Sequence, residues 1–192
     1  MKVLVIIDAQ NDFISGSLIN SQAMVRVNNI VKLINEFDGD DIILTQDTHY
    51  DESYFLMPNY LDTLEGEKLP IPHCIANTEG WQINRKIVAA VDEKHKTGCR
   101  IHFIQKSTFG SYDELIETLQ LFEDYSEIEK ITFCGFCTDI CVISNVLITK
   151  AAFSETPIEV IENCCAGSTP EKHEAALQVM ESCHIDITKE DK

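Results

Sequence analysis

The strongest constraint on the fold is a regular alternation of short apolar runs with longer segments of helical periodicity. The apolar runs are rich in Val, Ile and Phe, as buried β-strands are. Strands that are apolar on both faces indicate a parallel sheet covered by helices on both sides. Strands are expected at residues 3–8, 41–46, 99–105, 130–135, 157–162 and, more weakly, 184–188, and helices at about 21–37, 81–94, 111–122, 139–153 and 170–183.

This pattern predicts an α/β protein built as a three-layer α/β/α sandwich, with a mostly parallel sheet of about six strands. At 192 residues, the chain is long enough for one domain with a sizeable core. We therefore expect a single domain over residues 1–192. Residues 47–80 interrupt the alternation with mixed, proline-containing sequence. Because such long loops in compact domains are usually functional, this segment is predicted to be an insertion that binds a metal or the substrate.

The charge of the chain excludes two classes of partner. Its 32 acidic and 15 basic residues give a formal net charge of −17, which repels phosphate backbones and anionic lipids. No nucleic-acid or membrane partner is expected. The first apolar run breaks at Asp8 and no small-residue cleavage site follows, so it is interpreted as a strand rather than a secretion signal. A cytoplasmic location is expected, with the eight cysteines as reduced thiols.

Reactive side chains follow four of the predicted strands. In an open parallel sheet, ligands bind beyond the carboxyl ends of the strands, so these side chains are expected to lie at one edge and to form a site. They are Asp8 after the first strand, Asp47 and His49 after the second, Lys106 after the third, and Cys137 and Cys141 after the fourth.

Three cysteines fall within eight residues, but their expected roles differ. Cys134 lies inside a predicted strand, so it does not converge with the others on a metal and is expected in the core. A redox pair of Cys134 and Cys137 is also disfavoured, because such pairs stand at a helix start. Thr138 is predicted to cap the next helix, which makes Cys141 its third residue. The helix dipole would stabilise a thiolate there, so Cys141 is the candidate nucleophile.

Three segments of the chain, "VIIDAQNDF", "QKSTF" and "GFCTDICV", resemble in order those of the isochorismatase-like cysteine hydrolases, a superfamily that includes the nicotinamidases. The resemblance implies Asp8 as general base and acid, Lys106 as a stabiliser of negative charge, and Cys141 as nucleophile. It also implies an oxyanion hole made by the backbone N–H groups of Cys137 and Cys141, with a cis peptide bond between Phe136 and Cys137.

The reaction implied by this resemblance is hydrolysis of a small amide through a thioester. Nicotinamide, which would give nicotinate and ammonia, is the preferred substrate. A ureido compound, a carbamoyl compound or another small amide is the alternative, and a non-catalytic binding relative is a third hypothesis. Members of the superfamily commonly self-associate, so the resemblance also implies a homo-oligomer.

The resemblance further implies a divalent metal, expected to be zinc, with manganese and iron as alternatives. An Asp-x-His pair, Asp47 and His49, follows the second strand, and His73 resembles the last ligand. Because residues i and i+2 of an extended chain point to the same side, the pair can chelate. Glu65 is the preferred fourth ligand. The alternatives to it are Glu67, Asp51 and Glu52.

Nicotinamidases hold the pyridine ring between aromatic side chains, and the chain matches this arrangement in part. Phe13 resembles one of these residues. Pro70 stands where the family often has a tryptophan, so another aromatic residue must take that role, and Phe109 is the expected one. The other candidates are Tyr54, Phe55 and Tyr112.

Overall fold

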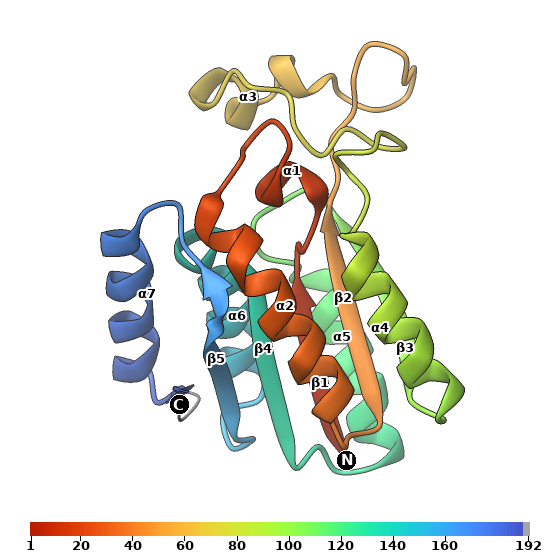
Figure 1. The fold of residues 1–192 in the computed structure, drawn as a ribbon, viewed down its shortest axis with the longest axis vertical. Helices are drawn as coiled ribbons and strands as arrows, with labels where there is room; N and C mark the ends of the chain where they lie inside the picture. Colours follow the sequence, from red (N-terminus) through yellow and green to blue (C-terminus); the bar gives the residue numbers. More distant parts are fainter. Residues whose placement is uncertain (190–192) are drawn as a thin grey trace.

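The described part of the chain, residues 1–189, folds around one six-stranded sheet in the computed structural model (Figure 1). The strand order is β3-β2-β1-β4-β5-β6, and all five neighbouring pairs are parallel. The prediction of a mostly parallel sheet of about six strands is confirmed. The strands are β1 (Lys2–Ile7), β2 (Asp41–Asp47), β3 (Arg100–Lys106), β4 (Lys130–Phe136), β5 (Ile158–Ala166) and β6 (Asp186–Thr188).

Helices cover both faces of this sheet. α2 and α4 pack against each other in front of the sheet in Figure 1, whereas α5 and α6 lie behind it and α7 packs beside α6. These layers confirm the predicted α/β/α sandwich. None of the described helices has the length and apolar composition needed to cross a bilayer. The helices are α1 (Asn11–Ile14), α2 (Ser21–Glu36), α3 (Leu64–Lys68), α4 (Arg85–Lys96), α5 (Asp113–Tyr125), α6 (Ile143–Ala152) and α7 (Pro170–Ser182), with short turns η1 (Tyr60–Asp62) and η2 (Thr138–Val142).

Two helices differ from the sequence prediction. α4 begins at Arg85 rather than near residue 81, because the side chain of Asn84 accepts a hydrogen bond from the N–H of Lys86 and caps the helix there. The segment predicted as one helix over 139–153 is divided into η2, a turn with π-helical hydrogen bonding, and α6. Such wide turns often occur at functional sites.

The order of the strands creates a crevice at the centre of the sheet. From β1 the chain builds β2 and β3 on one side, and β4, β5 and β6 continue on the other. β1 is held rigidly in place because Val3 to Ile7 are fully buried. Ligands bind where the strand order reverses, beyond the carboxyl ends of the two strands. Here that point lies between Asp8, after β1, and Cys137, after β4.

The segment that follows β2 crosses above the carboxyl ends of the strands, at the top of Figure 1. Residues 48–80 contain only η1, α3 and irregular chain. An isolated β-bridge between His49 and Ile75 joins the two ends of this segment to each other. The segment is attached to the body of the protein where the N–H of Cys74 donates to Oδ2 of Asp12 at 2.7 Å and the N–H of Thr48 donates to the carbonyl of Lys106 at 2.8 Å. The segment therefore forms a cover over the crevice.

The close approach of β4 to β1 depends on Gly135, which has φ +125°. A Cβ atom there would lie 2.0 Å from the backbone oxygen of Ile7. We predict that Gly135→Ala lowers the free energy of unfolding by about 2–5 kcal/mol, the sum of backbone strain and overpacking. Gly98→Ala is the matched control, because Gly98 has φ +102° but open space around it. Urea denaturation should show a clearly smaller loss for Gly98→Ala, and equal losses would contradict the role of the close approach.

Candidate active site

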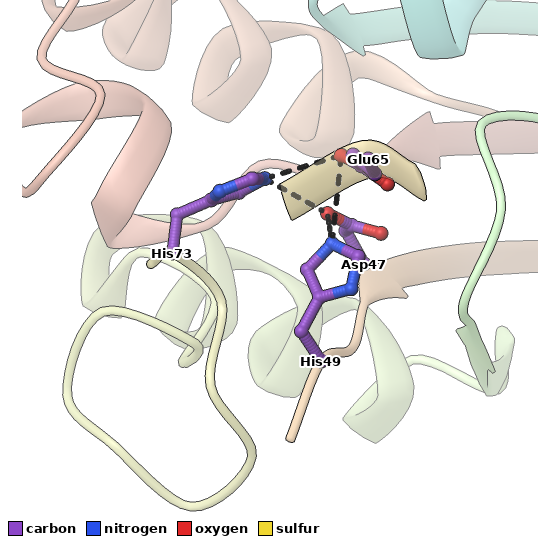
Figure 2. A group of neighbouring side chains, drawn as sticks. All are labelled: Asp47, His49, Glu65 and His73. Carbon is purple, nitrogen blue, oxygen red and sulfur yellow. Dashed lines mark hydrogen bonds and ion pairs between the residues drawn. The ribbon is translucent and has the colours of Figure 1, made fainter. Parts of the chain in front are cut away.

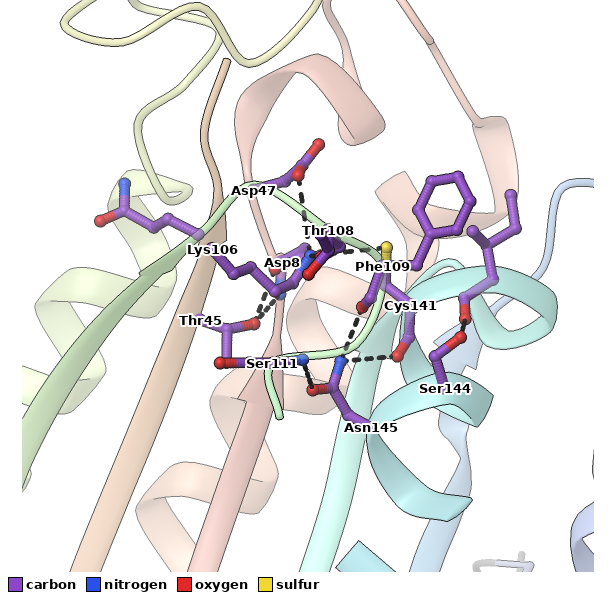
Figure 3. A network of polar contacts seen from close by, with 12 residues as sticks. Asp8, Thr45, Asp47, Lys106, Thr108, Phe109, Ser111, Cys141, Ser144 and Asn145 are labelled. Carbon is purple, nitrogen blue, oxygen red and sulfur yellow. Dashed lines mark hydrogen bonds and ion pairs between the residues drawn. The ribbon is translucent and has the colours of Figure 1, made fainter. Parts of the chain in front are cut away.

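The side chain of Lys106 lies at the centre of the site (Figure 3). Lys106 is the last residue of β3 and is only 3% exposed. Its Nζ lies 2.6 Å from Oδ2 of Asp8 and 3.7 Å from Sγ of Cys141, and it donates to the carbonyl of Thr108 at 3.1 Å. The structure therefore brings together the three residues that the sequence pattern placed at the ends of separate strands.

The two carboxylate oxygens of Asp8 have different partners: Oδ1 contacts Thr45 and Oδ2 contacts Lys106. The residue is fully buried, and its φ of 46° is unusual for a residue other than glycine. The Thr45 hydroxyl donates to Oδ1 at 2.6 Å, and the N–H of Asp8 donates to the same hydroxyl oxygen at 3.1 Å. Burial raises the pKa of Asp8, although the Lys106 charge acts in the opposite direction. A carboxyl group with a raised pKa suits proton transfer.

Cys141 is 4% exposed and lies in η2, where its side chain lines a cavity. Burial raises the pKa of its thiol well above the usual value, and the nearby carboxylates of Asp8 and Asp47 raise it further, while Lys106 lowers it. The direction of this shift favours the neutral thiol, in contrast to the thiolate that the place of Cys141 near a helix start predicted.

The predicted helix cap at Thr138 is wrong. The Thr138 hydroxyl is 2.7 Å from Nδ1 of the buried His173 on α7, and Cys137 precedes the turn without a side-chain cap. The peptide bond between Phe136 and Cys137 is cis, as the resemblance implied. Cys134 is fully buried, in agreement with its predicted place in the core, and all eight cysteines are free thiols.

Four side chains beside this group form a second cluster (Figure 2). Asp47 ends β2, Glu65 lies on α3, and His49 and His73 lie on the irregular chain of the segment above the sheet. One ligand atom from each lies within 4.8 Å of the others. The alternatives Glu67, Asp51 and Glu52 are exposed on the surface and lie outside this cluster.

The electrostatics of the cluster suit a cation. Burial raises the pKa of Asp47, but its contacts with His49 and His73 and the Lys106 charge outweigh burial and hold that pKa below its usual range. Burial and the Asp47 charge raise the pKa of Glu65. Two adjacent carboxylates of this kind are best compensated by a metal ion.

The histidines are placed as metal ligands usually are. Nε2 of His49 lies 3.0 Å from Oδ2 of Asp47, and Nε2 of His73 lies 3.6 Å from the same atom. Nδ1 of His73 lies 2.9 Å from the carbonyl oxygen of Ile71. Because a carbonyl only accepts hydrogen bonds, Nδ1 carries the proton and Nε2 faces the cluster with its lone pair. The donor set of two nitrogens and two carboxylates therefore fits a divalent transition metal.

Two residues that the sequence analysis missed hold the site together. The ring of Tyr60 packs against the rings of His49 and His73, with centroids 4.7 and 5.0 Å apart, and its hydroxyl donates to a carbonyl at 2.7 Å. Asn145, fully buried on α6, donates to the carbonyls of Cys141 and Phe109 at 2.8 and 3.0 Å. Neither residue belongs to a motif, so only their buried contacts identify them.

Cys141 of the first group and Asp47, Glu65 and His73 of the second line one cavity of about 1000 Å³. Lys106 connects them, because its Nζ is also 3.7 Å from Oδ1 of Asp47. Phe13 and Phe109 line the cavity, and the ring of Phe13 lies 5.8 Å from that of His73. The other aromatic candidates, Tyr54, Phe55 and Tyr112, do not line it.

Comparison with known proteins agrees with this arrangement. The model of the isochorismatase domain matches residues 2–191. The chain belongs to the isochorismatase family. An uncharacterised family member, PncA of Bacillus subtilis (strain 168), is 30% identical over 147 residues, which cover 74% of each chain.

One relative and one solved structure have an assigned activity. A nicotinamidase of Schizosaccharomyces pombe is 25% identical to the chain, over 97% of the chain and 92% of the relative. The crystal structure of the nicotinamidase/pyrazinamidase PncA from Bacillus subtilis is 26% identical and has a TM-score of 0.77. It covers 97% of this chain and 98% of its own. The similarity to these two family members thus extends over nearly the whole length of the chain.

The Lys106 ammonium should be essential for stability, because it compensates two buried carboxylates. We predict that Lys106→Met lowers the free energy of unfolding by about 3–5 kcal/mol in chelator-treated protein, measured with urea. Adding Asp8→Asn to this variant should recover part of the loss, because the uncompensated charge is removed. Lys96→Met, which breaks the exposed pair with Glu93, is the control and should cost at most about 0.5 kcal/mol. Equal losses for Lys106→Met and Lys96→Met would contradict the account.

Proposed function

We propose that the protein is a metal-containing, cysteine-dependent amidase of the nicotinamidase type, which converts nicotinamide and water to nicotinate and ammonia. As a member of its family, it is a hydrolase that acts on amide C–N bonds. One observation supports the proposal most strongly. The Lys106 ammonium lies 3.7 Å from Sγ of Cys141 and 2.6 Å from Asp8, and Cys141 lines the same cavity as Asp47, Glu65 and His73 of the four-residue cluster. A protein that only binds a ligand has no need of this arrangement.

The buried thiol requires a base, and Asp8 supplies it. Asp8 accepts the proton of the Cys141 thiol as the sulfur attacks the amide carbonyl carbon. The resulting tetrahedral intermediate collapses, the C–N bond breaks, and Asp8 gives the proton to the leaving nitrogen, so ammonia departs. Cys141 is then acylated as a thioester. Water, deprotonated by Asp8, attacks the thioester, and collapse releases the acid while the proton returns to sulfur.

The negative charges formed in these steps need fixed partners. Lys106 stabilises the thiolate and the Asp8 carboxylate in turn, because its ammonium contacts both. The backbone N–H groups of Cys137 and Cys141 are proposed to bind the oxyanion of the tetrahedral intermediate. Both residues line the cavity, so a carbonyl oxygen can reach them.

Asp47, His49, Glu65 and His73 are proposed to hold the divalent metal. The two imidazole nitrogens and two carboxylates suit zinc, with manganese and iron as alternatives. When bound, the metal would supply a Lewis acid that orients the ring nitrogen of the substrate and the attacking water. Phe13 and Phe109 would hold the ring. A different small amide, such as a ureido or carbamoyl compound, is the alternative substrate, since the cavity is larger than nicotinamide alone requires.

Ammonia release tests the reaction and the nucleophile together. We expect zinc-loaded protein to release ammonia from nicotinamide, and Cys141→Ala to abolish this, because within residues 1–189 Cys141 is the cysteine whose sulfur contacts the Lys106 ammonium. Cys183→Ala is the matched control, since Cys183 is a free and exposed cysteine, and it should retain full activity. Turnover of other amides without nicotinamide would move the assignment to the alternative substrate. Undiminished turnover by Cys141→Ala would refute the mechanism.

Metal binding can be tested without measuring turnover. We predict that Glu65→Gln weakens zinc affinity at least about tenfold, because a carboxylate ligand is lost, as measured by competition with a chelating dye. Glu67→Gln lies on the same helix and removes the same charge from an exposed position, so it should leave zinc affinity at the value of the unmodified protein. Equal effects of the two substitutions would show that general charge, rather than ligation, governs binding.

A further inference from the structure

The part of the cavity wall that lies outside the proposed metal cluster carries basic side chains, although the protein as a whole is strongly acidic. The chain carries a formal net charge of −17, yet among the described residues that line the cavity only Asp47 and Glu65 are acidic. Both belong to the proposed metal cluster. The remaining wall contains two basic residues, Lys68 and Lys172, among apolar and uncharged polar side chains. Beyond the metal cluster, the wall is therefore positive in a strongly negative molecule.

These two lysines are not engaged elsewhere. Within residues 1–189, neither ammonium forms an ion pair with a carboxylate, and neither donates a hydrogen bond to a side chain or carbonyl. Other lysines of the same chain do find carboxylate partners. These pairs are Lys2 with Asp38, Lys96 with Glu93, Lys130 with Glu159 and Lys189 with Glu162. Two lysines without a carboxylate partner among the described residues therefore border the same cavity in a protein with twice as many acids as bases, and both ammonium groups are free to bind an anion there.

The lysines come from separate elements that border the cavity. Lys68 is the last residue of α3, and Lys172 lies in the first turn of α7. In Figure 1, α3 lies above the carboxyl edge of the sheet and α7 lies beside the sheet. A volume of about 1000 Å³ is at the upper end of the range for sites that bind drug-sized molecules. A single pyridine ring with an amide group therefore leaves much of this cavity empty, including the part that the lysines border.

We propose that, besides nicotinamide in its inner part, the cavity accepts amides that carry a carboxylate remote from the scissile bond and prefers them to their uncharged analogues, with Lys68 and Lys172 binding that carboxylate. This inference rests on the proposed function, because it assigns a substrate class to the same site. The amide group lies against Cys141, the body of the substrate lies along the apolar wall, and the carboxylate faces the two ammonium groups. The lysines also offset the repulsion that a strongly acidic protein exerts on an anionic substrate.

Matched substrate pairs test this selection. Succinamic, glutaramic and terephthalamic acids each have a free amide and a carboxylate, and their methyl esters differ only in the missing charge. The ratio of kcat/KM for acid over ester should exceed one in low salt and fall as salt screens the charges. Lys68→Gln and Lys172→Gln should each lower this ratio about two- to fivefold, and the double variant about tenfold, as expected for exposed charge pairs.

Lys96→Gln is the control, because Lys96 is an exposed lysine far from the cavity lining, and it should keep the ratio of the unmodified protein. A ratio of one or less, or an unchanged ratio in the double variant, would overturn the proposal.

Calorimetry with Cys141→Ala separates this proposal from the proposed function. We expect Cys141→Ala to bind the acids more tightly than the esters, and to lose this difference when Lys68→Gln and Lys172→Gln are added. That result would support the anion site even if the native protein hydrolysed none of these amides. If the protein hydrolysed neutral amides, showed no higher kcat/KM for the acids than for the esters, and bound both equally tightly, the amidase function would stand and the anion site would be refuted.

Discussion

The buried ammonium of Lys106 is the interaction on which the site depends. Asp8 and Asp47 are both buried near the thiol of Cys141, and without a cation between them the two carboxylates would repel each other in a poorly solvated region. Lys106 is the last residue of β3 and Asp47 is the last residue of β2. Asp8 follows β1, and Cys141 lies after β4. The four strands β3, β2, β1 and β4 are consecutive neighbours in the sheet, so this single charge connects four chain segments at one edge.

The Lys106 ammonium also lies between two neighbouring groups that have different proposed roles. On one side it contacts Asp8 and Cys141, the pair that exchanges a proton in the proposed reaction. On the other side it reaches Asp47, which belongs to the cluster proposed to hold the metal. Because burial raises the pKa of the Cys141 thiol, the base beside it is as necessary to the proposed reaction as the sulfur itself.

The sequence allowed the fold to be predicted because the strands of the sheet centre are apolar on both faces and the side chains that follow them are polar. Val3 to Ile7 run uninterrupted to Asp8, which is the signal of a buried strand that ends at a site. The environment of a side chain could not be predicted in the same way. The state of the Cys141 thiol depends on how deeply it is buried, and the partner of Thr138 is a histidine 35 residues further along the chain.

The choice between Glu65 and Glu67 shows a second limit of the sequence. Both glutamates stand shortly before His73, so the sequence leaves both as candidates, with Glu65 preferred. On a helix, residues two apart point in different directions. Only the finding that residues 64–68 form α3 separates them. Tyr60 fixes this helix, because a Cβ on Gly66 would lie 2.1 Å from the Tyr60 carbonyl oxygen, while the Tyr60 ring packs on His49. The proposed metal ligands and the fold of the covering segment are thus coupled.

Mass spectrometry of acid-quenched protein during turnover tests the central claim most directly, because it detects whether Lys106 and Asp8 bring a substrate carbonyl to the sulfur. The account predicts a transient acyl adduct of the substrate on the peptide that contains Cys141, at a level that depends on the intact Asp8 side chain. Turnover of an amide with no adduct at any quench time, or an adduct on another cysteine, would contradict it.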